Sequence, residues 1–372
     1  MTTPLQPGRR VVLTEYAETP EEAMEKHLHL VEQSPPAASD LKPHEILIRV
    51  RSAGVAWVDL LMTSGQYQHM APLPYTPGLE FAGEVIAVGA GVDTSQCSVG
   101  DRVLSDFMKV GPRSYGDYQR AGGFATYAVV PADAVLQIPG DLSFDEAAVF
   151  LQAYETAYHC LVARGNLQRG ETVLINGATG LTGLASVQVA KLLGATVIAT
   201  GRSDGKLQGV LEQGADHVVN VLGEHGGVRE FRTDVKQLTQ GKGVDVVYDA
   251  VGGEVSLESL RCTNFGARFL IVGWTSTPNV ARGRGQRGAP NVNMLPTNII
   301  QMKQLSILGC PTVIAAAKDP SIRPARIAKI LEWAKQDRIR PHVSHVFTLG
   351  DFKSAMLARW RGEVTGGCVI QP

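Results

Sequence analysis

The chain has 372 residues, of which 44% are hydrophobic, and its 35 basic and 36 acidic side chains give a net charge of -1. This length and apolar content allow a large buried core and favour two domains over one. The balanced charge excludes a global field that would attract nucleic acid or anionic lipid, so we expect a small-molecule partner.

The N-terminal stretch MTTPLQPGRRVVLTEYAE lacks the apolar core of a secretory signal. No later stretch approaches the roughly twenty apolar residues that span a bilayer. These two features predict a cytoplasmic protein without a membrane partner. The cysteines are far apart and form no Cys-x-x-Cys pair, which predicts reduced, mostly core-filling thiols rather than a disulfide framework or a zinc knot. They are Cys97, Cys160, Cys262, Cys310 and Cys368.

The first third of the chain contains short β-like runs separated by Gly and Pro. These runs cover residues 45–51, 81–89, 101–104 and 125–130. Their composition predicts a compact, partly antiparallel β domain.

From residue 143 onward, apolar helical stretches alternate with short, nearly continuous apolar runs. Such runs are typical of a parallel sheet that is covered by helices on both faces, as in nucleotide-binding domains. The predicted strands cover residues 172–176, 196–200, 217–220, 244–248, 268–273 and 305–308.

A predicted helix at 324–337 is followed by a β-like tail at 342–347 and 368–370, which resembles the first domain in composition. We therefore predict a nucleotide-binding domain at 153–312, inserted into a domain formed by 1–152 and 313–372.

One Gly-rich segment, between Trp274 and Asn291, carries three cations: Arg282, Arg284 and Arg287. It is interpreted either as a solvated surface loop, or as a lid or a contact for an anionic substrate.

A glycine-rich turn at 177–183 connects the strand at 172–176 to a helical stretch at 184–193. This order of strand, turn and helix lets backbone N–H groups and the positive helix end meet a pyrophosphate. Within the turn, Gly180 permits close approach of the ligand and Gly183 permits tight packing of helix on strand. The turn therefore predicts a dinucleotide site.

The end of the second strand of this domain indicates which dinucleotide binds. Gly201 occupies the position at which an NAD enzyme holds a carboxylate for the ribose hydroxyls. Beyond it, Arg202, Ser203 and Lys206 offer donors suited to a 2′-phosphate, so the sequence favours NADPH. In the alternative interpretation, the two cations are ordinary surface charges. Asp204 is expected to cap the helix that follows.

Several motifs in chain order together resemble the medium-chain dehydrogenase/reductase superfamily, and among its members the zinc-free quinone oxidoreductase-like branch. The motifs are Ala-Gly-Val at 53–55, Ser-Gly-Gln-Tyr at 64–67, Pro-Leu-Pro-Tyr-Thr-Pro-Gly at 72–78, Val-Gly-Asp-Arg-Val at 99–103, Gly-Ala-Asp-His at 214–217 and Asp-Ala-Val-Gly-Gly at 249–253.

The resemblance implies an α/β fold in which a Rossmann-type, doubly wound parallel sheet is inserted in a GroES-like, mostly β catalytic domain. It also implies a homodimer formed through the last strand of the nucleotide-domain sheet, near 305–308. The cofactor-binding residues that it implies, together with those of the turn, are Gly177, Ala178, Thr179, Gly180, Leu181, Thr182, Gly201, Arg202, Ser203, Lys206, Val251, Gly252, Val272 and Gly273.

At the positions where zinc-dependent relatives carry their catalytic ligands, this chain has Ala56, Leu79 and Gln152-Ala153. None of these side chains is a strong zinc ligand, and the lobe at 105–123 has no cysteine, so we predict zinc-independent chemistry without a bound metal. The histidine pairs His27/His29 and His342/His345 are interpreted as surface or strand residues.

Tyr67 belongs to the Ser-Gly-Gln-Tyr stretch, which faces the cleft in the family that the sequence resembles. We therefore predict that its hydroxyl donates a hydrogen bond to a substrate oxygen. Asp59 is expected to organise the pocket wall more than to act as an acid. Trp57 either stacks on a planar substrate or fills core. Three functions remain open: NADPH-dependent quinone reduction, reduction of conjugated C=C bonds in enals, enones or enoyl thioesters, and a non-catalytic NADPH-binding role as a sensor or structural protein.

Overall fold

The computed structural model describes residues 5–277 and 293–372, and the chain forms two compact units. The described part of the first unit covers 5–152 and 343–372, and that of the second covers 153–277 and 293–342. The second unit thus begins at residue 153 and extends to residue 342, and the chain returns to the first unit at residue 343. The segment with Arg282, Arg284 and Arg287 lies outside the described residues.

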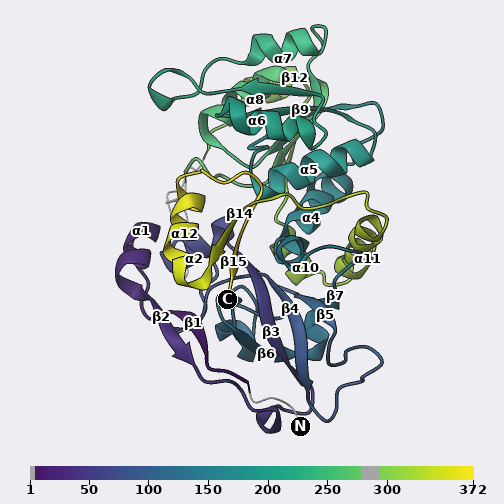
Figure 1. The fold of residues 1–372 in the computed structure, drawn as a ribbon. Coiled ribbons are helices and arrows are strands. Elements are labelled where there is room, and N and C mark those ends of the chain that lie inside the picture. The colour runs from purple at the N-terminus through teal and green to yellow at the C-terminus, as the bar shows by residue number, and fades with distance from the viewer. Residues whose placement is uncertain (1–4, 278–292) are drawn as a thin grey trace. The chain divides into compact units, whose positions relative to one another are not determined.

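The first unit contains a seven-stranded sheet in the order β14-β15-β3-β4-β5-β7, with β6 paired to β3 (Figure 1). A separate hairpin joins β1 and β2. The strands are β1 (Gly8–Leu13), β2 (Leu28–Gln33), β3 (Glu45–Gly54), β4 (Phe81–Val88), β5 (Arg102–Ser105), β6 (Tyr127–Pro131), β7 (Val135–Gln137), β14 (Val343–Thr348) and β15 (Gly367–Gln371).

Strand β3 organises this sheet because three other strands pair with it. It runs antiparallel to β4, β6 and β15, so the N-terminal and C-terminal parts of the chain share one sheet. Ile46, Ile48 and Val50 point from β3 into a core that also contains Phe81 and Val85 of β4. This alternation of apolar side chains makes one face of β3 and β4 the inner face of the unit.

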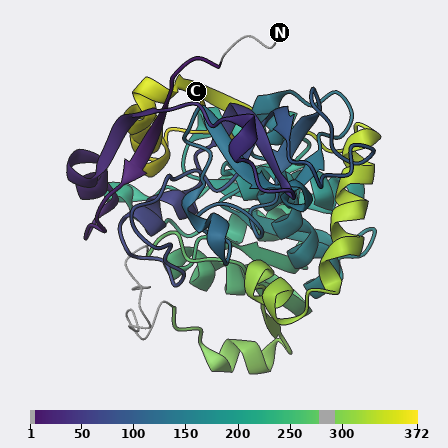
Figure 2. The same cartoon turned by 90° about the horizontal axis from the view of Figure 1, so that it is seen from below.

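Helices of the first unit lie against this sheet. In Figure 1 and in Figure 2, the purple N-terminal segment lies beside the yellow helix α12. The indole of Trp57 stacks on Trp360 of α12 with 5.1 Å between ring centroids, and Trp360 Nε1 donates to the Glu21 carboxylate. The helices and single turns are α1 (Pro20–Glu22), η1 (Ala23–His27), η2 (Ala38–Asp40), α2 (Trp57–Thr63), η3 (Asp117–Arg120), η4 (Ala132–Ala134), α3 (Phe144–Ala147), η8 (Leu349–Asp351) and α12 (Phe352–Trp360).

The second unit contains a six-stranded parallel sheet in the order β10-β9-β8-β11-β12-β13. The chain starts in the middle at β8, moves out to β10, and returns past β8 to β11 and β13, which is the doubly wound topology predicted for this region. Its strands are β8 (Thr172–Asn176), β9 (Thr196–Gly201), β10 (His217–Asn220), β11 (Val244–Asp249), β12 (Thr263–Ile271) and β13 (Ser306–Gly309).

Helices cover both faces of this sheet. Helix α5 connects β8 to β9, and α6 connects β9 to β10. Because crossovers between parallel strands are right-handed, these two helices cover the same face of the sheet. Helices α7, α8 and α9 connect strands stepping in the opposite direction and cover the other. The helices are α4 (Leu151–Tyr158), η5 (His159–Arg164), α5 (Leu181–Leu192), α6 (Asp204–Glu212), η6 (Glu224–Gly226), α7 (Arg232–Leu238), α8 (Gly253–Cys262), α9 (Thr297–Met302), α10 (Thr312–Lys318) and α11 (Ile322–Lys335).

A buried ion network holds α11 to the second unit. Glu155 on α4 has no exposed surface and accepts hydrogen bonds from Arg323 and Arg326 of α11 at 2.9 to 3.2 Å. Arg326 also contacts Nδ1 of His159 at 3.1 Å. Burial, reinforced by the charges of Arg326 and Arg164, lowers the pKa of His159 to about 4. These contacts explain why residues up to 342 belong with the parallel sheet.

All five cysteines are buried and free, in agreement with their predicted role as core residues. Within residues 5–277 and 293–372, no helix has both the length and the apolar character that crossing a bilayer requires.

Candidate functional site

The turn between β8 and α5 has the geometry of a phosphate-binding loop. Gly177 leaves the strand at φ +69°, where a side chain would be strained. Ala178 N–H then donates to the Thr200 carbonyl at 3.0 Å, which ties the turn to the end of β9. Gly180 has no side chain to cap α5, so the N–H groups at the start of this twelve-residue helix face outward for an anion.

Gly183, in the first turn of α5, allows this close approach of helix and strand. A Cβ atom at this position would lie 2.3 Å from the Gly177 carbonyl oxygen and 2.7 Å from Cα of Ala178. Both neighbours are backbone atoms that cannot rotate away. The requirement for glycine, predicted from the motif, therefore has a direct steric cause.

A buried hydrogen-bond network supports the turn from below, and sequence analysis missed it. Asn176 Nδ2 donates to Asp249 Oδ1 at 3.3 Å and to Ser259 Oγ at 2.8 Å, while Thr200 Oγ1 donates to Asn176 Oδ1 at 3.0 Å. Ser256 also donates to the Asp249 carboxylate. The ends of β8, β9 and β11 are thereby locked together at the edge where nucleotides bind in such sheets.

The predicted residues after β11 and β12 lie at the same edge. The Asp249 carboxylate accepts from the N–H groups of Val251 and Gly252, and the Asp249 carbonyl accepts from Val272 N–H at 2.9 Å. A Cβ on Gly177 would lie 3.0 Å from Val251 Cγ2, so the two turns adjoin each other. The structure thus brings Val251, Gly252 and Val272 next to the phosphate-binding turn.

Arg202 and Ser203 are exposed just beyond the end of β9, and Lys206 lies within the first turn of α6. Gly201 is buried, and a Cβ on it would lie 3.0 Å from Thr179 Cγ2 of the phosphate-binding turn. The expected helix cap is wrong: α6 starts at Asp204 itself, whose carboxylate accepts from Asn220 Nδ2 at 2.7 Å. One carboxylate oxygen is therefore bound to Asn220.

In the first unit, Asp59 is buried in α2 and clamps two backbone segments. Its carboxylate accepts from Ala56 N–H at 2.9 Å and from Gly78 N–H at 3.0 Å. Burial raises the pKa of Asp59 to about 6, against the opposing effect of these hydrogen bonds and of Arg359. These bonds fit the expectation that Asp59 organises the wall formed by residues 56 and 78.

The raised pKa of Asp59 leads to a pH prediction. Its pKa rises from 3.8 to about 6 on folding, so its contribution to stability is complete below pH 3.8 and is lost as the pH rises through 6. This difference corresponds to about 3 kcal/mol. We expect the free energy of unfolding of an Asp59→Asn variant to lack this decline between pH 4 and 7, as measured by urea titration. The control variant Asp40→Asn, at an exposed position, should retain this decline in the free energy of unfolding. If the free energy of unfolding depends on pH in the same way in Asp59→Asn and in the unmodified protein, the raised pKa of Asp59 is wrong.

Tyr67 is mostly buried at the edge of the core of the first unit, and its hydroxyl has no protein partner among the described residues. The guanidinium of Arg113 lies over the Tyr67 ring at 5.4 Å and over the Phe107 ring at 5.7 Å. The Nε of Arg113 is buried and makes no hydrogen bond within the described structure. The charge of Arg113 adds to burial in lowering the pKa of His69. Sequence analysis missed Arg113 because its contact with Tyr67 joins two segments that are distant in the sequence.

Trp57 is half-buried, and one face of its ring is occupied by the stack with Trp360. It also packs against the apolar core of the first unit. The packing role is therefore present in the structure, and stacking on a planar substrate would be restricted to the remaining ring surface.

The three positions that hold zinc in relatives do not fit a metal ion here. Ala56 is the residue before α2, Leu79 is part of the apolar core, and Gln152 N–H donates to the buried carboxylate of Glu80 at 2.9 Å. None of these side chains offers a thiolate, imidazole or carboxylate. Zinc-independent chemistry remains a prediction from the residues at these positions.

Comparisons with known proteins place the chain in a family. Residues 42–140 match the alcohol dehydrogenase GroES-like domain family, and residues 182–321 match a family described as zinc-binding dehydrogenase. The chain is 33% identical over 336 residues to the quinone oxidoreductase-like protein 2 homolog of Nematostella vectensis, covering 90% of this chain and 83% of the relative. Human quinone oxidoreductase is 30% identical, with coverage of 75% and 74%.

A solved mycobacterial structure in complex with NADPH is similar, with a TM-score of 0.75 and 26% identity, covering 98% of this chain and all of the other. The chain thus belongs to the medium-chain dehydrogenase/reductase superfamily. It has the Rossmann-type and GroES-like architecture of that superfamily and is an NAD(P)-dependent oxidoreductase that acts on small molecules.

Proposed function

We propose that the protein is an NADPH-dependent, zinc-independent reductase that transfers hydride to a quinone. The observation that carries this proposal is the end of β9, where Gly201 is followed by the exposed Arg202 and Ser203 next to the phosphate-binding turn. The similarity to quinone oxidoreductases supports the acceptor, and the residues at the zinc positions support chemistry without a metal.

Several parts of the second unit would hold the cofactor. The N–H groups at the start of α5 would bind the pyrophosphate, Arg202, Ser203 and Lys206 the 2′-phosphate, and the backbone around Val251, Gly252, Val272 and Gly273 the nicotinamide end. When bound, NADPH supplies the hydride.

The first unit would bind and orient the acceptor. A quinone delocalises the charge that it gains onto its own oxygen, so the protein needs donors and positioning more than a Lewis acid. The Tyr67 hydroxyl would donate to that oxygen, and the Arg113 guanidinium beside it would stabilise the negative charge. Asp59 would hold the wall at residues 56 and 78 in place.

The direct test of the proposal is an NADPH-oxidation screen on the purified protein, with quinones, enals, enones and enoyl thioesters as acceptors. Turnover of quinones that is unaffected by a chelator is the expected result. Activity with alkenes alone would replace the quinone with a conjugated substrate. Tight NADPH binding without any turnover would favour the non-catalytic role instead.

The cofactor assignment makes a separate prediction. We expect Arg202→Gln to lower kcat/KM for NADPH by roughly tenfold to a hundredfold, because a charge-assisted contact to the 2′-phosphate contributes about 1.5–3 kcal/mol. The value for NADH, which lacks this phosphate, should change little. Exposed Lys318→Gln is the charge-matched control. A preference of the unmodified protein for NADH would refute the assignment of Arg202 and Lys206.

The role of Tyr67 predicts a selective loss of turnover. We expect Tyr67→Phe to lower kcat by roughly tenfold to a hundredfold, as a lost donor to a developing oxyanion does, while the melting temperature stays the same. The matched control is Tyr75→Phe, because the buried hydroxyl of Tyr75 also lacks a partner within the described structure. Steady-state kinetics and thermal denaturation measure both effects, and equal kinetics for the two variants would contradict the role.

The same pair of residues would also serve the second candidate function, the reduction of conjugated C=C bonds. Hydride addition to an enal, enone or enoyl thioester leaves an enolate, and the unpartnered Nε of Arg113 lies close to the ring of Tyr67. A guanidinium and a phenol together would stabilise that oxyanion. The same screen separates the two acceptors.

We further propose that the protein acts in the cytoplasm as a homodimer. Strand β13 is the outer strand of the described six-stranded sheet and pairs only with β12 there. Pairing with a second copy would cover this edge. Sedimentation analysis of the purified chain measures the oligomeric state.

A further inference from the structure

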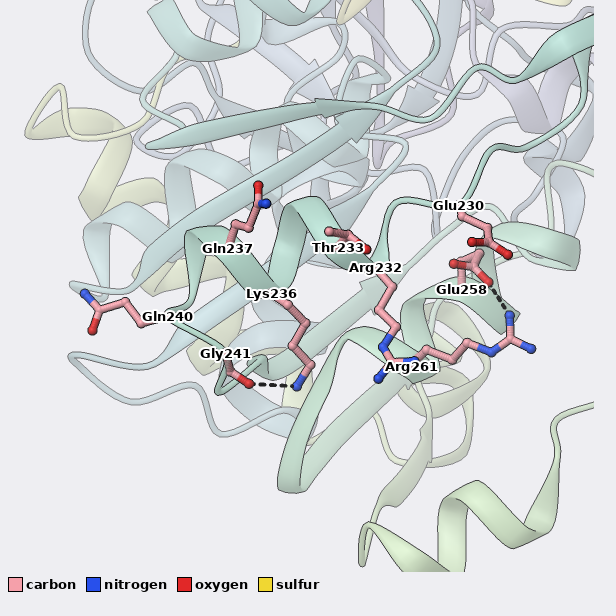
Figure 3. Close-up of a pocket in the computed structure, with 9 residues that line it drawn as sticks. All are labelled: Glu230, Arg232, Thr233, Lys236, Gln237, Gln240, Gly241, Glu258 and Arg261. Carbon is pink, nitrogen blue, oxygen red and sulfur yellow. Dashed lines mark hydrogen bonds and ion pairs between the residues drawn. The ribbon is translucent and has the colours of Figure 1, made fainter.

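A groove between α7 and α8 of the second unit is separate from the features assigned to the cofactor. We call it the α7–α8 groove; its volume is about 790 Å³. Figure 3 shows its side chains, with the Lys236 amine directed to the Gly241 carbonyl and the Arg261 guanidinium to the Glu258 carboxylate. The groove is lined by Glu230, Arg232, Thr233, Lys236, Gln237, Gln240, Gly241, Glu258 and Arg261.

Two of the residues that line this groove lie at the edge where the strands of the parallel sheet begin. Gly241 precedes β11, whose first residue is Val244, and Arg261 precedes β12, whose first residue is Thr263. The phosphate-binding turn at 177–183 follows the last residue of β8 and lies at the opposite edge of the sheet. A ligand in the groove would therefore not be the phosphates of a cofactor bound at that turn.

The positive charges exceed the negative charges around the groove. Arg232, Lys236 and Arg261 line it. Burial, and then the charges of Lys236 and Arg232, lower the pKa of the nearby Lys303. Of the two acids, Glu258 is already paired with Arg261. Glu230 also lines the groove, so its lining holds three cations and two acids.

The cations of the groove retain donors that the protein does not use. Arg232 is exposed, and its guanidinium makes no hydrogen bond or ion pair in the described part of the chain. Lys236 Nζ donates to the carbonyls of Gly241 and Lys242, which leaves one of its three N–H bonds free. Burial and the neighbouring charge of Arg232 lower the pKa of Lys236, so the two cations repel each other. An anion between them would relieve that repulsion.

We propose that the α7–α8 groove binds a small polyanion that carries a phosphate or diphosphate group. Arg232 offers a planar fork of donors that matches phosphate oxygens, while Lys236 and Arg261 supply charge from the two facing helices. Gln237 and Gln240 add neutral donors at the rim. The volume suits a metabolite-sized ligand.

Inorganic pyrophosphate is the probe for this site, titrated by calorimetry into the full chain at constant ionic strength. We expect Arg232→Gln to weaken binding about tenfold, which is the effect of losing about 1.4 kcal/mol. Glu230→Gln should have the opposite sign and tighten binding a fewfold, because it removes a repelling carboxylate. Lys242→Gln removes one positive charge beside the groove without touching its lining and should leave the affinity unchanged.

The cofactor site could also bind pyrophosphate, so an Arg202→Gln, Lys206→Gln double variant is titrated in parallel. Retained binding in this variant, together with the loss in Arg232→Gln, is the expected result. Three results would overturn the proposal: equal affinities for Arg232→Gln and the unmodified protein, loss of all pyrophosphate binding in the cofactor-site variant, or no binding at millimolar concentration. Thermal denaturation of Arg232→Gln, an exposed substitution, shows that the fold is intact.

Discussion

A Gly183→Val variant is expected to lose NADPH binding and to unfold more easily, by about 3 kcal/mol. The first atom of any side chain at this position would lie 2.3 Å from the Gly177 carbonyl oxygen and 2.7 Å from Cα of Ala178. To relieve these clashes, α5 must move away from β8. That movement opens the turn that we assign to the pyrophosphate, so affinity and stability should fall together.

The matched control is Gly209→Ala, in the middle of α6. A Cβ there meets no atom within 4 Å, and alanine favours a helix by about 1 kcal/mol over glycine. This variant should bind NADPH normally and melt at the same or a higher temperature. Fluorescence titration with NADPH and urea denaturation measure both effects. Unchanged NADPH affinity in Gly183→Val would show that the cofactor phosphates bind elsewhere.

The second large effect is expected for Glu155→Gln, which should lower the free energy of unfolding by about 3–5 kcal/mol. Glu155 is fully buried and forms ion pairs with both Arg323 and Arg326, which are themselves 9% and 2% exposed. Removing its charge takes a shared, buried counter-charge away from two guanidinium groups. The loss should appear first in the docking of α11 on α4.

Glu332→Gln provides the comparison, because it removes the carboxylate of an exposed ion pair with Lys329 on the same helix. Such pairs contribute about 0–1 kcal/mol, so this variant should resemble the unmodified protein. Equal stability for the Glu155 and Glu332 variants in guanidinium denaturation would mean that the buried network contributes little.

Local patterns in the sequence predicted the elements of the parallel sheet and its glycine turn well. Each strand is a short apolar run, and Gly177, Gly180 and Gly183 are required by backbone geometry that depends only on near neighbours. The expected run at 305–308 appears as Ser306–Gly309, and the predicted helix at 324–337 appears as Ile322–Lys335. Such shifts of one or two residues arise because helix and strand ends depend on tertiary contacts.

The unpredicted features depend on side chains that are distant in the sequence. Asn176 meets Asp249 73 positions away, and Glu155 meets Arg323 168 positions away, so no local pattern reveals them. The placement of α10 and α11 in the first domain differed from the structure for this reason. A signal was available: Arg323 and Arg326 lie three apart on a helix, on a face that is otherwise apolar, which indicates a buried acidic partner.

The position of β15 between β14 and β3 has a consequence for synthesis of the protein. Residues 367–371 are synthesised after the whole of the second unit, yet they complete a sheet whose first strand begins at residue 45. A hydrogen bond from Arg359 Nε to the Val55 carbonyl likewise joins the N-terminal and C-terminal parts of this unit. The parallel-sheet unit can therefore form before β15 has been synthesised, whereas the sheet of the β-rich unit stays incomplete until that strand is available.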